Sequence, residues 1–458
     1  MSRSHLPIVF TSLVMLAPLS GAGAAEKGYD LRPGVEPDKT VRIEAQLDVG
    51  GDLKLVEEGK PKTLKMSVSA QLVYDEKDQS VRSAAGTTHV RSVRQYRQAR
   101  AAIKIGEGAV EPKLRASRRL IVADEADGRV TLFSPTGPLT REELDLVDVP
   151  ANSLLLDQLL PFKAVKVGDR WRHDSALMAA LLGLDVVSQS DVESELKDVA
   201  ADRARLEMAG KLLGAVGGVA TEIEVKAKYR FDFNQRRVTG LGLLVKEKRA
   251  IGLVNAGLDV VAKLQLALAP SSGGEQELSE AALAQLPLEP RPEFLTLECV
   301  SPTKKFSIYH NRNWHLMTDA GELLALRYLD RGELVAQCNV SSLADVEPGK
   351  EPSLATFQHD LERSLGESFG RYLEASEATN SLGHHIYRIV AEGRVSDLPI
   401  QWRYYLIADR KGHLAVFAFT VESDLAERLG NADEQLAATI EFAANSTTGK
   451  PTRAAARK

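Results

Sequence analysis

The chain has 458 residues, of which 26% are charged and 44% are apolar, and its formal net charge at pH 7 is -5. This is ordinary globular composition, and so small a net charge argues against nucleic acid as the main partner. Because one hydrophobic core rarely grows beyond about 250–300 residues, the length predicts two domains.

Residues 1–25 have the features of a secretory signal peptide. An apolar run from Leu6 to Leu19 follows a basic start and precedes the small residues 22–25. Such a leader predicts export, with the first 25 residues removed. The run is shorter than the roughly 20 apolar residues of a spanning helix, and no later segment is long and apolar enough to cross a bilayer. We therefore expect a periplasmic or extracellular protein that is not membrane-spanning.

Alternation of apolar and polar residues dominates residues 26–269. It is strict in the segments 41–49, 64–74, 219–233 and 258–268. Each such strand has one apolar and one polar face, which is typical of antiparallel sheets. Some strands reach about 15 residues, against a usual length of about 5–6. The pattern predicts a curved antiparallel sheet or half-barrel.

A Leu-rich helical insert at about 140–182 interrupts these strands. Thr140 and Glu143 form a capping-box pattern, and Asp174 is a candidate helix cap. The insert is expected to cover the apolar face of the sheet. We hypothesise an apolar pocket between the two, although a close-packed core without a pocket is the alternative. The expected pocket residues are Leu155, Leu159, Leu177, Leu181, Ile223, Val225 and Tyr229.

Residues 270–292 are rich in Pro, Ser and Gly and are expected to form a linker between two halves that fold independently. Residues 293–444 predict strands, a helix over 353–373, further strands, and a final helix or helix-strand end at 432–442. This order indicates an α+β domain. The polar, basic tail 445–458 is expected to be disordered.

The second domain resembles the Mog1/PsbP-like α+β sandwich. The resemblance depends on Phe306–Ile308 leading to Trp314, on the amphipathic helix after Pro352, and on the aromatic strands 398–405 and 416–419. It implies a protein-binding or assembly module. The first domain is similar, in its layout of long strands under a Leu-rich cover, to the LolA/LppX group of exported, lipid-carrying half-barrels. Fold-level resemblance does not fix function.

The only two cysteines, Cys299 and Cys338, lie in strand-like segments of the second domain. We expect them to be close in space, and export would permit a disulfide between them. Two buried free thiols are the alternative.

Catalytic and metal-binding motifs are missing from the sequence. It has no HExxH or GxSxG motif, and the adjacent His384 and His385 open a strand, where neighbouring side chains point to opposite faces. The segment from Arg82 to Arg119 holds ten basic residues, which we interpret as a solvated face, with contact to anionic lipid or cell-wall polymer as the alternative. We expect no enzyme, no cofactor and no metal.

These features favour an exported, non-enzymatic binding or assembly module for a protein partner or an apolar, lipid-like ligand. A cell-envelope hydrolase with dispersed catalytic residues stays open as the alternative.

The signal peptide predicts the first residue of the exported protein. The exported protein should begin at Ala25 or Glu26, because the small residues before them fit a signal peptidase site. Intact-mass spectrometry of the protein recovered from its exported fraction measures this, and retention of Met1 would show the prediction to be wrong.

Overall fold

The structure, a computed structural model, describes residues 28–34, 40–57, 59–82, 88–126, 128–271, 276–320 and 323–443. The predicted signal peptide, part of the predicted linker and the predicted disordered tail lie outside these residues. Among them, no helix combines the length and the apolar character that crossing a membrane requires.

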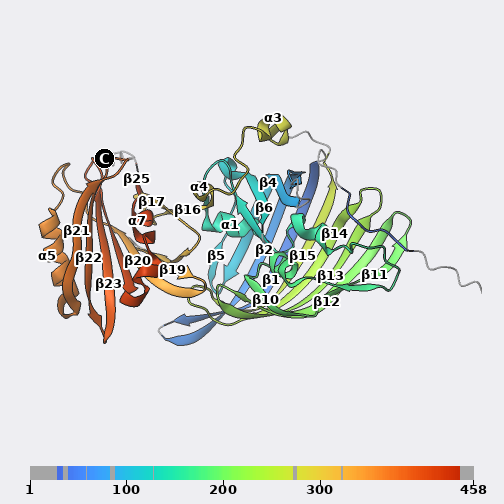
Figure 1. Cartoon of the computed structure of the whole chain (residues 1–458), viewed down its shortest axis with the longest axis horizontal. Helices are drawn as coiled ribbons and strands as arrows, with labels where there is room; N and C mark the ends of the chain where they lie inside the picture. Colours follow the sequence, from blue (N-terminus) through green and yellow to red (C-terminus); the bar gives the residue numbers. More distant parts are fainter. Residues whose placement is uncertain are drawn as a thin grey trace, which may run out of the picture.

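An open, 14-stranded antiparallel sheet forms most of the first half (Figure 1). Its main path runs in the order β7 (Arg129–Phe133), β6 (Leu120–Ala126), β4 (Thr88–Ile105), β2 (Lys60–Asp78), β1 (Thr40–Glu57), β15 (Gly257–Pro270), β14 (Arg237–Arg249), β13 (Val219–Asp232), β12 (Arg203–Val216), β11 (Glu193–Ala200) and β9 (Arg170–Arg172). Off this path, β10 (Val186–Ser190) pairs with β12, whereas β3 (Val81–Arg82) and β5 (Gly108–Val110) pair with β4. The predicted long, alternating strands are confirmed, and burial along β13 alternates as the sequence does.

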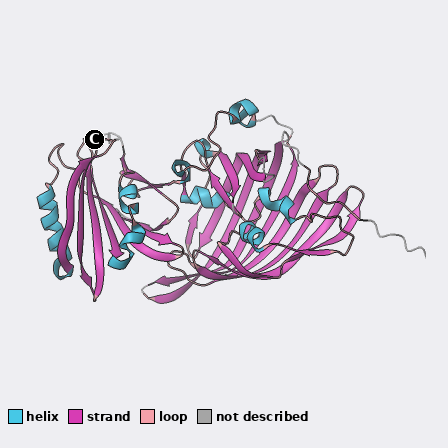
Figure 2. Cartoon of the chain, in the orientation of Figure 1, coloured by secondary structure: helices cyan, strands magenta, loops and turns pink. Residues whose placement is uncertain are grey.

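The Leu-rich insert covers the apolar face of this sheet (Figure 2). It contains α1 (Arg141–Val147), the 3-10 helix η2 (Ser153–Leu159) and α2 (Ser175–Leu182). The capping box of Thr140 and Glu143 is present, and the side chain of Asp174 accepts a hydrogen bond from the backbone of Ala176. Both predicted helix starts are therefore confirmed, although the leucines after Asn152 form a 3-10 helix.

The segment predicted as a linker also packs on the sheet. It contains η3 (Gln276–Leu278), α3 (Glu280–Leu283) and α4 (Pro292–Leu295). Leu278 and Leu283 are buried in one cluster with Val93, Val122 and Phe133. Because Arg94 and Ile121 face the Leu-rich insert, Val93 and Val122 belong to the opposite face. Part of the sheet is therefore covered on both sides.

The second half is built on a 7-stranded antiparallel sheet. Its order is β18 (Trp314–Ala320), β19 (Leu323–Asp330), β20 (Glu333–Ser342), β24 (Leu414–Glu422), β23 (Leu398–Ala408), β22 (His385–Val395) and β21 (Phe369–Thr379). One core cluster contains residues of α5 (Leu354–Leu365), and another contains residues of α6 (Ala426–Leu429) and α7 (Ala432–Ala437). The predicted α+β class is confirmed.

The predicted helix over 353–373 was too long. It ends at Leu365, because Gly366 adopts a positive φ of 55°, and residues 369–379 form the edge strand β21. A glycine in this region of φ is a common helix terminator. The apolar spacing of Phe369 and Leu373 continued the helical period by coincidence.

A small 4-stranded sheet joins the two halves. Its order is β25 (Glu441–Phe442), β17 (Phe306–His310), β16 (Leu297–Val300) and β8 (Leu139–Thr140). The parallel pair β8–β16 links strands of different halves. The guanidinium of Arg115 adds an ionic link, because it lies 2.7 Å from Glu143 and 2.6 Å from Glu298.

The halves also meet at two hairpin tips, one between β12 and β13 and the other between β19 and β20. A Cβ atom added at Gly332 would lie 2.8 Å from the Cα atom of Gly218. Backbones therefore touch where the two tips meet, and a side chain at either glycine would separate them.

This contact predicts a difference between two glycine variants. Gly332 and Gly349 both have positive φ, of 81° and 76°, but nothing lies within 4 Å of a Cβ atom at Gly349. Gly349→Ala should cost about 1 kcal/mol from backbone strain alone. Gly332→Ala should cost about 1–2 kcal/mol more, because the tips must move apart. Urea unfolding of both variants measures the difference, and equal losses would show that the tip contact does not contribute to stability.

Candidate functional site

The structure gathers the predicted pocket residues in one hydrophobic core. Six are buried there, and the seventh, Leu177, is partly buried against them; the six are Leu155, Leu159, Leu181, Ile223, Val225 and Tyr229. The Tyr229 hydroxyl donates to the Ser194 hydroxyl at 2.8 Å, and burial raises the pKa of Tyr229. The neighbouring Leu154 and Leu160 border a pocket.

Cys299 and Cys338 are buried as reduced thiols in a single core cluster of the second half. Burial raises the pKa of the Cys338 thiol well above its usual range. A protonated, buried thiol behaves as a small apolar side chain.

The basic segment is exposed or partly exposed over most of its described length, as a solvated face should be, but ion pairs engage part of it and Arg94 is buried. Arg91 pairs with Asp124 at 2.6 Å, and Arg97 pairs with Asp75 at 2.7 Å. Arg94 is only 1% exposed. Acids on neighbouring strands therefore neutralise part of this charge.

Arg94 is the centre of a buried polar network between the sheet and η2. Its Nε donates to Glu76 at 2.6 Å, and its Nη2 donates to Asn152 and to Ser153. The guanidinium also lies over the ring of Tyr74, 5.1 Å from its centroid. Although burial alone would lower the pKa of Arg94, its neighbours Tyr74 and Glu76 raise it, so the side chain stays charged.

Glu76 completes this network. It accepts hydrogen bonds from Ser153 at 2.8 Å and from Ser92 at 3.1 Å. The Ser153 hydroxyl is also 3.0 Å from the Tyr74 hydroxyl. A charged pair in a core is tolerated only when such bonds satisfy its remaining donors and acceptors. The network therefore fixes the start of η2 on strands β2 and β4.

A pocket of about 340 Å³ lies beside this network, and we call it the η2 pocket. Apolar side chains form much of its wall, and among them Phe162 is 90% exposed and stands at the rim. The apolar lining residues are Pro33, Val41, Val90, Leu154, Leu160, Pro161, Phe162 and Pro270. Ligand pockets in proteins are commonly about 300–1,000 Å³ and have mainly apolar walls.

Polar and charged side chains also line the pocket, among them Asp78, Gln158 and Arg237. Glu76, Ser92 and Ser153 of the buried network border the pocket. Asp157 borders it too, accepts a hydrogen bond from the backbone of Val238 at 2.8 Å, and has its pKa raised by burial. Polar groups in a pocket can orient a ligand, whereas the apolar part of the wall supplies affinity.

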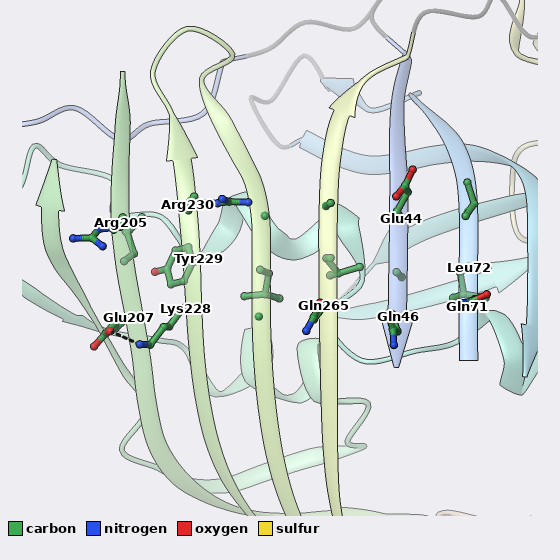
Figure 3. Close-up of a pocket in the computed structure, with 18 of the residues that line it drawn as sticks. Glu44, Gln46, Gln71, Leu72, Arg205, Glu207, Lys228, Tyr229, Arg230 and Gln265 are labelled. Carbon is green, nitrogen blue, oxygen red and sulfur yellow. Dashed lines mark ion pairs between the residues drawn. The ribbon is translucent and has the colours of Figure 1, made fainter. Parts of the chain in front are cut away.

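A second pocket, of about 950 Å³, lies on the bare polar face of the large sheet (Figure 3). Gln71, Gln46 and Gln265 stand in one cross-strand row, and the same row continues through Gly242 to Lys228. Gly240 and Gly242 lie on β14, between β13 and β15. Because they have no side chains, the sheet surface is lower at β14 than on the two neighbouring strands.

The charges of this sheet-face pocket largely neutralise one another. Lys228 lies 3.4 Å from Glu207, and Arg205 pairs with Asp198. The Lys228 side chain is 83% exposed, so the pair is screened by water. The surface suits water and polar contacts and offers no enclosed apolar wall, although it is the larger of the two pockets.

In the part of the chain that the structure describes, no group of three or more His, Cys, Asp or Glu side chains is arranged to hold a metal ion. The adjacent histidines differ in environment. His384 is buried against the ring of Phe442, whereas His385 lies 3.5 Å from Glu351.

Comparison with known proteins gives only distant likenesses. No family model matches the sequence, and no curated protein matches it. A solved protein from Bacteroides thetaiotaomicron VPI-5482 is similar with 13% identity and a TM-score of 0.24, over 32% of this chain and 48% of that one. The chain therefore spans about half the length of that structure.

Two further likenesses concern the resemblances noted in the sequence. Cyanobacterial PsbP from Synechocystis sp. PCC 6803 has 12% identity and a TM-score of 0.26, over 38% of this chain and 99% of that one. The MucA/MucB complex of Pseudomonas aeruginosa has 12% identity and a TM-score of 0.15, over 90% of this chain and 96% of that one. Values this low place the chain in no family.

The buried ion pair between Arg94 and Glu76 predicts that replacing Arg94 strongly lowers the stability of the protein. Arg94→Met should destabilise the protein by about 3–5 kcal/mol, because Glu76 is left charged and buried. The matched Arg100→Met, on the same strand but exposed, should change stability by less than about 0.5 kcal/mol. Chemical unfolding measures both.

Adding Glu76→Gln to Arg94→Met should recover part of the loss, because it removes the unpaired charge. Equal stability of the Arg94→Met and Arg100→Met variants would contradict the role given to the network.

Proposed function

We propose that the chain is an exported, non-enzymatic binding module that holds an apolar, lipid-like ligand in the η2 pocket. The observation that supports the proposal is a pocket of about 340 Å³ whose accessible lining is mainly apolar, beside the buried network of Arg94 and Glu76. An apolar guest gains free energy by leaving water for such a wall. The polar groups at its edge would then orient one end of the guest.

The wall is suited to a guest without charge along its length. Leu154 and Leu160 come from the Leu-rich insert, whereas Val41 and Val90 come from the sheet. Opposed apolar surfaces from two elements can enclose a chain or a flat apolar molecule from both sides. The sheet-face pocket has no such opposed walls, and its lysines and glutamines would have to lose water on binding an apolar guest.

The groups near the pocket also favour binding over hydrolysis. Ser153 is the hydroxyl closest to a carboxylate, yet that carboxylate, Glu76, is the counter-ion of the buried Arg94. A base for serine activation must be able to accept a proton. Glu76 already accepts hydrogen bonds from Arg94, Ser92 and Ser153, so its carboxylate is engaged within the network. We therefore assign Ser153 to the network that holds η2.

If the η2 pocket holds the ligand, filling it should weaken binding. Leu154→Trp places a large ring in the η2 pocket and should weaken binding of the apolar fluorescent dye N-phenyl-1-naphthylamine by about ten-fold or more. Leu177→Trp is the matched control, because Leu177 is also partly buried at the edge of the same core but does not border the pocket. Dye titration of the mature protein and both variants gives the affinities.

Native mass spectrometry of the mature protein purified from its own host supplies an independent measurement, because a retained lipid would appear as added mass. Equal dye affinity of the two tryptophan variants, together with no retained ligand, would overturn the proposal.

A further inference from the structure

The rim of the η2 pocket carries the most exposed large apolar side chain among the described residues. Phe162 is 90% exposed, and Val167 on the same loop is 50% exposed. Two exposed apolar side chains on one short loop form a small apolar surface, and contiguous apolar surface is what marks contact sites. The loop over residues 161–168 therefore has a feature that the core does not explain.

The loop is held in this position from both sides. Val165 is buried and exchanges two backbone hydrogen bonds with Tyr29, of 2.7 and 3.0 Å. The backbone of Gly168 donates to Leu196 at 2.8 Å. On the other side, Leu160 is only 3% exposed. With Leu160 and Val165 fixed in the core, the exposed side chains between them are Phe162, Lys163 and Ala164.

Cationic residues follow Phe162 along the chain. Lys163 and Lys166 are exposed on the loop, and Arg170 and Arg172 follow on β9 with exposed side chains. The two arginines pair with Glu195 and Glu193 on β11, whereas Lys163 has no ion pair among the described residues. An exposed aromatic ring beside lysines is the composition that binds the headgroup region of an anionic bilayer.

We propose that the loop over residues 161–168 docks the protein reversibly on an anionic lipid bilayer. Phe162 and Val167 enter the headgroup region, and Lys163 contacts anionic headgroups. Because Phe162 also borders the η2 pocket, docking brings the mouth of that pocket to the bilayer, where an apolar guest can pass without crossing water. The transfer step rests on the proposed function, but the docking itself does not.

The contact should be weak and reversible. Stable anchoring takes two strong signals, such as two acyl chains or one chain with a polybasic patch. One ring, one valine and a few cations fall short of that requirement. The net charge of -5 adds repulsion at long range, but salt screens it beyond about 8 Å, so the local lysines decide the contact.

Vesicle co-sedimentation tests the docking. The mature protein should bind phosphatidylglycerol-containing vesicles and bind pure phosphatidylcholine vesicles more weakly. Phe162→Ala should reduce binding to the anionic vesicles by about ten-fold. Lys163→Glu should reduce it by about five-fold or more. Leu398→Ala is the matched control, because Leu398 is 51% exposed in the second half and should leave binding unchanged.

Two variants separate docking from ligand binding. Lys163 does not border the η2 pocket, so Lys163→Glu should keep the dye affinity of the unmodified protein while losing vesicle binding. Leu154→Trp should lose dye affinity and keep vesicle binding. No binding to anionic vesicles, or binding that both loop variants retain, would overturn the docking proposal. If Leu154→Trp and Leu177→Trp both keep dye affinity, and no retained ligand is found, the proposed function is overturned instead.

Discussion

The ion pair between Arg94 and Glu76 is the constraint on which the first half of the molecule depends. It lies where the apolar face of the sheet meets the Leu-rich insert, and Asn152 and Ser153 bind the same two side chains. Hydrophobic contacts alone would let the leucines of η2 slide over an apolar sheet, because such contacts have no direction. Hydrogen bonds to a fixed charge set one register. Once that register is set, Leu155 and Leu159 enter the core, while the partly buried Leu154 borders the pocket.

The large sheet is used differently on its two faces. Its apolar face receives the Leu-rich insert, and near β4 and β6 the opposite face is covered as well, by residues 276–295. Elsewhere that opposite face stays polar, with charges such as Lys228 and Glu207 paired across strands. Pairing of this kind keeps a wide sheet face hydrated without attracting one class of charged partner. The distribution leaves the end of the sheet beside η2 as the place where apolar surface is open to a guest.

Much of this fold follows from local rules that the sequence expresses. Strict alternation identified the long strands, and the capping box at Thr140 located α1. Long-range partners could not be identified in this way. The burial of Arg94 depends on Asn152 and Glu76, which are distant in sequence, and a basic segment with period three does not show which arginine is buried until its acidic neighbours are known. The pocket residues were missed for a related reason, because a shift of one residue in η2 decides which leucines face the core.

The pairing of β1 with β15 carries a consequence for how the chain reaches this state. These strands lie side by side in the middle of the sheet, yet they are the first and the last long strands of the first half. A chain that emerges amino end first must keep the open edge of β1 unpaired until the segment 257–270 has emerged. Unpaired strand edges recruit other strands, and contacts so distant in sequence form slowly. Until β1 and β15 pair, the newly made protein therefore depends on chaperones or on a low concentration to avoid aggregation.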